Sequence, residues 1–75
     1  MPSHKLDLSG LKCPLPVLRT RKALKALQPG DLLEVLCTDP LAAIDLPNLI
    51  RETGDHVEVL RRDSDGIAFL IEKRG

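Results

Sequence analysis

The chain has 75 residues with 11 basic and 11 acidic side chains, so its formal net charge at pH 7 is zero. This length predicts one small domain, 1–75, which buries only roughly 60% of the surface of its unfolded chain. With one Phe, no Tyr and no Trp, the chain lacks the aromatic platforms on which single-stranded nucleic acids stack, so we expect no direct nucleic-acid binding. No segment resembles a signal peptide or is long enough to span a bilayer, so we expect no membrane association and a cytoplasmic protein with reduced thiols.

The first half of the chain predicts a strand, a turn and a helix. Residues 4–8 alternate between polar and apolar, which indicates a short strand, and Gly10 marks a turn after it. A helix is predicted over 14–28, with a basic face opposite a mostly apolar one, and the Pro-Gly pair at 29–30 ends it. The apolar face consists of Val17, Thr20, Ala23, Leu24 and Leu27.

The next element is a strand over residues 31–38. Its alternation places Leu33, Val35 and Cys37 on one face, which we expect to be the core face. We therefore interpret Cys37 as a packing residue, since free cysteines behave as small hydrophobes.

A second helix is predicted after this strand, with Asp39 as its N-cap and Pro40 in its first turn. Pro47 interrupts the helical pattern. We therefore expect a short first turn, a kink or restart near Asp45, and a main helix that runs to about Thr53 and is stopped by the next residue, a glycine.

Two strands end the chain, over residues 56–62 and 67–73, and the Asp65-Gly66 pair between them is a strong hairpin signal. The element order is β-α-β-α-β-β. Because each helix has one apolar face, we predict the α+β class: a two-layer sandwich in which both helices pack on one face of a four-stranded mixed sheet. The strand order is left open.

The other face of the sheet permits two interpretations. Glutamates on this face indicate contact with solvent, but leucines share it, and they form either a partner surface or a patch that their neighbours cover in a twisted sheet. The glutamates are Glu34, Glu58 and Glu72, and the leucines are Leu32, Leu36, Leu60 and Leu70.

Cys13 is the candidate reactive residue because it directly precedes Pro14, and proline favours the first turn of a helix. A thiol at a helix N-terminus faces unpaired N–H groups that favour an anion, which lowers its pKa and stabilises a thiolate or a persulfide. Lys12 adds positive charge. The alternative is that Cys13 is a small buried hydrophobe, as many single cysteines are.

The surroundings of Cys13 in the sequence favour the reactive interpretation. Leu15 and Leu18 fall outside the apolar face of the predicted helix and should be exposed near the cysteine. We hypothesise that they form a docking surface for a partner together with basic residues of the same half of the chain, where the net charge is +5 over residues 1–28 against −5 over the rest. The basic members are Lys12, Arg19 and Lys22. The alternative is that these charges are merely solvated.

Other kinds of site find little support. Two Cys and two His are scattered through the chain without the spacing of metal ligands, so we expect no metal and no cofactor. A nucleophilic enzyme would need a base held by a third group. His56 is the only internal histidine, and its position beside a glycine and an aspartate favours a turn.

Four short motifs stand in register along the chain: C-P-x-P at 13–16 after Gly10, P-G at 29–30, D-P at 39–40 and D-x-P at 45–47. Together they closely resemble the TusA-like (SirA-like) sulfur-carrier family, and the resemblance runs from Lys5 to about Lys73. It implies a β-α-β-α-β-β sandwich in which Cys13 accepts sulfane sulfur as a persulfide and hands it to another protein. Gly10, Pro14 and Pro16 would form the scaffold of that cysteine, and Asp39, Pro40, Asp45 and Pro47 would be structural.

The resemblance also implies partners. Donors in the family are cysteine desulfurases and rhodanese-like or DsrE-like sulfurtransferases, and acceptors serve tRNA thiolation, molybdenum-cofactor synthesis or sulfur oxidation. Such a chain is a carrier that acts by persulfide exchange rather than a stand-alone enzyme. The alternative from another functional class is a non-catalytic regulatory or redox-sensing interaction module. The donor, the acceptor, the oligomeric state and any role in selenium handling are left open.

Overall fold

A computed structural model describes residues 3–12 and 14–74 of the chain. The predicted element order is confirmed. The strands and helices are β1 (Ser3–Leu8), α1 (Leu15–Lys25), β2 (Leu32–Cys37), α2 (Ala42–Thr53), β3 (His56–Asp63) and β4 (Gly66–Glu72).

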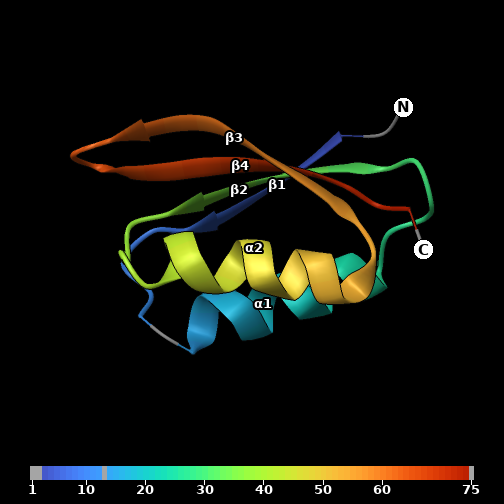
Figure 1. The fold of residues 1–75 in the computed structure, drawn as a ribbon, viewed down its shortest axis with the longest axis horizontal. Coiled ribbons are helices and arrows are strands. Elements are labelled where there is room, and N and C mark those ends of the chain that lie inside the picture. Colours follow the sequence, from blue (N-terminus) through green and yellow to red (C-terminus); the bar gives the residue numbers. More distant parts are fainter. Residues whose placement is uncertain (1–2, 13, 75) are drawn as a thin grey trace.

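The four strands form one mixed sheet in the order β1-β2-β4-β3, which the sequence had left open. β1 and β2 are parallel, and β4 is antiparallel to both of its neighbours, so β3 also runs parallel to β2. Both helices connect parallel strands, and both connections step across the sheet in the same direction. Because such crossovers are right-handed, both helices lie on one face of the sheet (Figure 1), as predicted for the α+β class.

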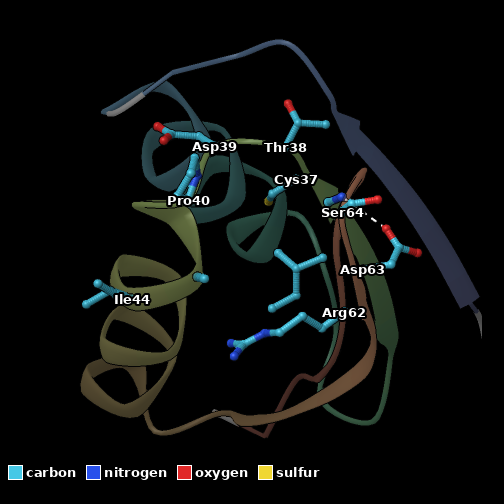
Figure 2. A pocket seen from close by; sticks show the side chains of 11 residues that line it. Cys37, Thr38, Asp39, Pro40, Ile44, Arg62, Asp63 and Ser64 are labelled. Atoms are coloured by element: carbon cyan, nitrogen blue, oxygen red, sulfur yellow. Dashed lines mark hydrogen bonds between the residues drawn. The ribbon is translucent and has the colours of Figure 1, made fainter.

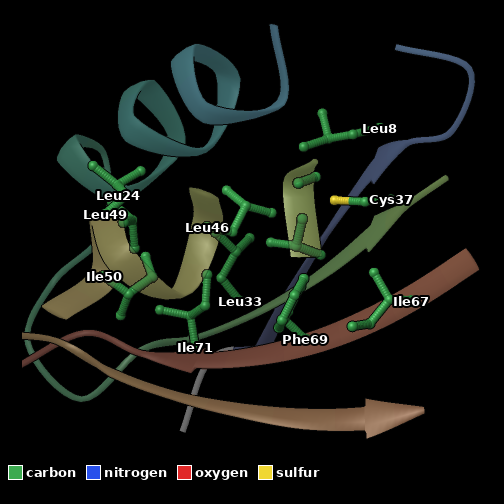
Figure 3. Close-up of a cluster of buried hydrophobic side chains, with 12 residues drawn as sticks. Leu8, Leu24, Leu33, Cys37, Leu46, Leu49, Ile50, Ile67, Phe69 and Ile71 are labelled. Atoms are coloured by element: carbon green, nitrogen blue, oxygen red, sulfur yellow. The ribbon is translucent and has the colours of Figure 1, made fainter. Parts of the chain in front are cut away.

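The core lies between the sheet and the two helices (Figure 3). Phe69, the only aromatic residue of the chain, is fully buried on β4 and pairs with Val35 on β2. The predicted inward face of β2 is confirmed, since Leu33, Val35 and Cys37 are all buried. The largest contributions from α2 are Leu46, Leu49 and Ile50.

The end of α1 differs from its prediction. The helix stops at Lys25 rather than about Gln28. Pro29 disfavours the helical conformation for the residue before it. In addition, the Asp31 carboxylate accepts the backbone N–H of Gln28 at 3.0 Å, and the Asp31 N–H donates to the Gln28 carbonyl at 3.0 Å. A turn closed by Asp31 therefore replaces the last helical turn.

The predictions for α2 were wrong in two details. Pro47 does not interrupt the helix, which is continuous from Ala42 to Thr53, because the turns on both sides of it bury apolar side chains in the core. Asp39 is not its N-cap: its side chain accepts the Leu41 N–H at 3.1 Å and its carbonyl accepts the Ala42 N–H at 3.0 Å, so it closes a turn just before the helix. The end of the helix at the left-handed Gly54 is as predicted.

The β3–β4 hairpin closes as its sequence predicts, with Asp63 paired with Gly66. The Asp63 side chain accepts the backbone N–H groups of Asp65 at 2.9 Å and of Gly66 at 3.2 Å, which holds the turn. A bulge between Val59 and Arg61 shifts the register, a feature the sequence did not predict.

The helix-free face of the sheet agrees mainly with the second interpretation. Leu32, Leu36 and Leu70 are half-buried among their neighbours, and only Leu60 is largely exposed. A continuous leucine patch is therefore not formed. Within 3–12 and 14–74, no helix is long and apolar enough to cross a membrane.

Candidate functional site

Residues 10–12, which lead to the C-P-x-P motif, lie at the edge of the sheet at which β1 and β2 end, which we call the carboxyl edge. Because these two strands are parallel, the loop after β1 and the loop after β2 meet there. The Gly10 N–H donates to the Thr38 hydroxyl at 2.8 Å and links the two loops. The N-terminal ends of both helices and the β3–β4 turn lie at the same end of the molecule (Figure 1).

The loop after β1 is held by local hydrogen bonds. The Asp7 carboxylate accepts the Ser9 N–H at 2.9 Å, and hydrogen bonds from the side chain and the backbone of Ser9 lower the pKa of Asp7. The Leu11 N–H returns to the Leu8 carbonyl at 3.1 Å, and Leu11 packs against the core. Gly10 has a φ of +81°, a conformation that other residues rarely adopt, whereas its role as scaffold of Cys13 stays a prediction.

The prolines of the motif form the start of α1. Pro14 is the N-cap, and Pro16 lies in the first turn with its ring buried. The Leu15 N–H donates to the Lys12 carbonyl at 2.9 Å, and the Leu18 N–H donates to the Pro14 carbonyl at 3.1 Å. The first turn contains no acidic residue, whereas the last turn contains two lysines. Cys13 itself lies outside the described residues. Because Pro14 is the N-cap, Cys13 comes one residue before the cap in the sequence, and its predicted reactivity stays a prediction.

The five predicted docking residues are exposed. Leu15 is 42% and Leu18 55% exposed, as their positions outside the apolar face of the helix indicated. Leu15, Leu18, Arg19 and Lys22 are spaced so that they share one face of α1, and Lys12 lies in the loop just before it. In the described part of the chain, the three basic residues form no ion pair, so their charges are available to a partner.

Cys37, the other cysteine, has the opposite character. It is fully buried at the end of β2 and packs in the core (Figure 3), which confirms its interpretation as a packing residue. Burial, and to a lesser extent the charge of Asp39, raises the pKa of the thiol to about 11. Cys37 is therefore neutral and shielded near pH 7, and it is a poor nucleophile.

Two features of the carboxyl edge were not predicted from the sequence. One is Thr38, whose contact with Gly10 follows only once β1 and β2 are known to be parallel neighbours. The other is a groove of about 380 Å³ between the start of α2 and the β3–β4 hairpin, into which Arg62 points (Figure 2). The side of the sheet on which Arg62 lies depends on the bulge in β3, for which the sequence gives no signal.

The chain matches the family described as Sulfurtransferase TusA over residues 4–73, which is nearly its whole length. It belongs to the TusA family. A Neisseria meningitidis serogroup A protein named as a proposed sulfur carrier is 48% identical over 71 residues, which cover 95% of each chain. The sulfur carrier protein TusA of Allochromatium vinosum is 39% identical over 70 residues, which cover 93% of this chain and 92% of that protein.

A solved structure supports the TusA-family fold. The crystal structure of the SirA-like protein from Desulfitobacterium hafniense superposes with a TM-score of 0.81 at 27% identity, and the match covers 96% of this chain and 99% of that one. The resemblance inferred from the four motifs is therefore confirmed at the level of family and fold.

Proposed function

We propose that this TusA-family chain is a sulfur carrier in which Cys13 accepts sulfane sulfur as a persulfide and relays it to an acceptor protein. The observation that carries the proposal is the place of Cys13 in the chain: it directly precedes Pro14, the N-cap of α1, in a family whose relatives are named as sulfur carriers. The donor would be a cysteine desulfurase or a rhodanese-like or DsrE-like sulfurtransferase. The acceptor would belong to tRNA thiolation, molybdenum-cofactor synthesis or sulfur oxidation, in the cytoplasm.

The proposed reaction is a thiol–disulfide type of exchange. The Cys13 thiolate attacks the outer sulfur of the donor persulfide, a bond forms between these two sulfurs, the sulfur–sulfur bond of the donor breaks, and the donor cysteine leaves as a thiolate. The acceptor thiolate later attacks the outer sulfur on Cys13 in the same manner. Neither step requires an external oxidant or reductant, and neither needs a general base. A single reactive thiol on the carrier is therefore sufficient for both steps.

The electrostatics near the start of α1 favour this chemistry. The positive end of a helix dipole stabilises an anion close to it, and no acidic side chain lies in the first turn of α1 to oppose this effect. Lys12 and Arg19 are exposed and have no ion-pair partner among the described residues. A thiolate or an anionic persulfide in this part of the chain would therefore be favoured over its neutral form.

We further propose that the exposed face of α1 contributes to partner recognition. Leu15 and Leu18 supply an apolar surface on this face, and Lys12, Arg19 and Lys22 supply charge that would attract an acidic partner. Reversal of charge at Arg19 and Lys22 should slow sulfur transfer from a protein donor. An unchanged rate with every donor would exclude a role for the basic residues.

The carrier function is tested by intact-protein mass spectrometry after incubation with a cysteine desulfurase and cysteine, or with a rhodanese and thiosulfate. The wild type should gain one sulfur, about 32 Da, and this gain should disappear in Cys13→Ser and persist in Cys37→Ser, the matched control. If no donor loads the wild type, or if the sulfur is found on Cys37, the proposal is wrong. A regulatory or redox-sensing module would then be the better interpretation.

A further inference from the structure

β1 forms an edge of the sheet whose outer side is open. Among the described residues it pairs with β2 alone, in a regular parallel register from Ser3 to Leu8 without a bulge, and it contains no proline. Open strand edges bind other strands unless bulges, prolines or charged side chains prevent it. β3, the opposite edge, has a bulge between Val59 and Arg61 and exposed charged side chains on both sides of it. β1 is therefore the less protected of the two edges.

The backbone groups that β1 leaves free follow from the hydrogen-bond ladder of the sheet. The Lys73 N–H donates to the Asp31 carbonyl at 2.9 Å, so these two residues form a hydrogen-bonded pair that continues the β2–β4 register. Such pairs alternate along antiparallel strands, so Leu32 and every second residue after it direct their backbone groups to β1 instead. In a parallel pair, the partner of such a residue directs its own N–H and C=O away from the ladder. These outward-directed partners on β1 are Ser3, Lys5 and Asp7.

The exposed face of α1 lies beside this open edge. α1 contacts β1 and β2 whereas α2 contacts β3, so the side of α1 that is turned away from α2 is the side of the β1 edge. Arg21 lines the groove between the two helices together with Leu49 of α2. Arg19 is two residues earlier, about 200° around the helix, and is therefore directed away from α2 and towards the edge. Leu15 and Lys22 share this face with Arg19.

The helix side of the open edge carries a net positive charge. Arg19 and Lys22 are exposed and form no ion pair within residues 3–12 and 14–74, and α1 contains no acidic side chain. Leu6 lies on the same side, since it pairs with the core residue Val35, and it is only half-buried. A strand added to this edge would cover Leu6 and would place every second side chain beside the two cations.

The acidic side chains near the edge do not cancel this charge. Asp31 is almost fully buried and lies 3.9 Å from the imidazole of His4. Asp7 and Glu34 pair with residues of the opposite orientation and face the helix-free side of the sheet. The edge therefore suits a segment whose side chains are acidic towards α1 and uncharged on the other side.

From these observations we infer that the open edge of β1 binds an extended segment of a protein partner, which adds a strand to the sheet and directs acidic side chains towards Arg19 and Lys22. The inference rests on the role in partner recognition proposed above for the exposed face of α1. Backbone hydrogen bonds supply the affinity of such a contact and alternate side chains its specificity. A second copy of this chain fits worse, because pairing of two β1 edges would bring the basic faces of two α1 helices together. Since β1 leads into residues 10–12, the partner is held beside the segment that precedes Cys13.

The test is the binding of a short blocked peptide that alternates Glu and Thr, titrated into the isotope-labelled protein and followed by NMR. Backbone amide signals of β1 and of the exposed face of α1 should shift. Lys5→Pro removes one free N–H from the edge and leaves the hydrogen bonds to β2 in place, and edge strands accept proline at such positions. The loss of this hydrogen bond should weaken binding about tenfold. Lys5→Ala is the control, because it removes the same side chain but keeps the N–H, and it should bind like the wild type.

Arg19→Glu tests the charge without any change in β1, and it should weaken binding of the Glu-Thr peptide about tenfold. Arg21→Glu is the matched control. It makes the same change of charge on the side of α1 that faces α2, where physiological salt screens it from the edge, so its affinity should stay within about twofold of the wild type.

Equal affinities of Lys5→Pro and Lys5→Ala would overturn the inference, as would equal binding of a peptide that has Lys in place of Glu. A dimer of the free protein that dissociates in Lys5→Pro would also overturn it, because a second copy would then cover the edge. Peptide binding does not require the Cys13 thiol, so these outcomes leave the carrier function intact. Failure of the wild type to take up sulfur from any donor would instead refute the carrier function and leave the peptide result unchanged.

Discussion

Gly66, the last residue of the β3–β4 turn, is the position at which the smallest possible side chain should be most damaging. Its φ is +154°, in a region that residues other than glycine rarely adopt. A Cβ atom built there would collide with the carbonyl oxygen of Cys37 and would also lie 3.5 Å from the Cγ2 atom of Thr38. Gly66→Ala therefore combines an unfavourable backbone conformation with a steric clash against backbone that cannot move freely.

The cost follows from these two effects. A residue held in a sparsely populated backbone region costs about 1–3 kcal/mol, and overpacking adds about 1–3 kcal/mol. The sum of about 2–6 kcal/mol is a large share of the roughly 4–11 kcal/mol expected for a domain of this length. At about 3 kcal/mol, the loss lowers Tm by about 12–24 °C, because 1 kcal/mol corresponds to about 4–8 °C at this size.

Thermal unfolding followed by circular dichroism measures this effect, and Gly54→Ala is the control. Gly54 also has a positive φ, +83°, but a Cβ atom there would meet nothing within 4 Å. Gly54→Ala should therefore cost only about 1–2 kcal/mol, the penalty of the left-handed conformation. If the two variants unfold at the same temperature, the clash with the Cys37 carbonyl does not contribute and the reasoning is refuted.

Three further predictions concern buried polar groups and the second thiol. Thr20→Val should raise the free energy of unfolding, measured in urea, by about 1 kcal/mol. The reason is that the Thr20 hydroxyl is fully buried and has no hydrogen-bond partner among the described residues. A loss of stability would show that the hydroxyl is satisfied. Asp55→Ala should lower the free energy of unfolding by about 3 kcal/mol. The buried Asp55 carboxylate accepts the Arg74 N–H and the Thr53 hydroxyl, each at 2.8 Å, and lies 3.9 Å from the Lys73 ammonium. Asp65→Ala, at an exposed position, should be nearly neutral. Equal losses from these two variants would contradict the role of Asp55. In a Cys13→Ser background, iodoacetamide at pH 8 should label Cys37 at least about 100-fold more slowly in the folded than in the unfolded protein. The reason is that a thiol pKa raised from 9.0 to about 11 leaves about one hundredth of the thiolate, and burial also blocks access of the reagent. Equal labelling rates would show that Cys37 is open to reagents.

The parts of the structure that the sequence predicted correctly depend on local patterns. Alternation in β2 predicted which of its side chains are buried, and the helical spacing in α1 predicted the exposure of Leu15 and Leu18. The glycines at positions 54 and 66 correctly marked a helix end and a hairpin. Each of these signals spans only a few residues, over which backbone geometry and solvent contact act directly.

The candidate site was predictable in part. The C-P-x-P motif indicated the start of α1, and Pro14 and Pro16 take the N-cap and first-turn positions there. The contact of Gly10 with Thr38 was not predictable, because the two residues are 28 positions apart and meet only after β1 and β2 pair in parallel. The role of Cys13 stays a prediction that the loading experiment decides.

Tertiary structure decided what the local patterns could not. α2 stays continuous through Pro47 because core packing on both sides offsets the missing hydrogen bond. The early end of α1, in contrast, is local, since the Asp31 side chain and Pro29 favour a turn. The groove between the start of α2 and the β3–β4 hairpin depends on a bulge that directs Arg62 to the helix-covered face and Arg61 to the other. The sequence alone determined which segments become strands and helices and which faces are apolar. Strand order, the continuity of α2 and the groove required the folded chain, because they arise from contacts between residues far apart in the sequence.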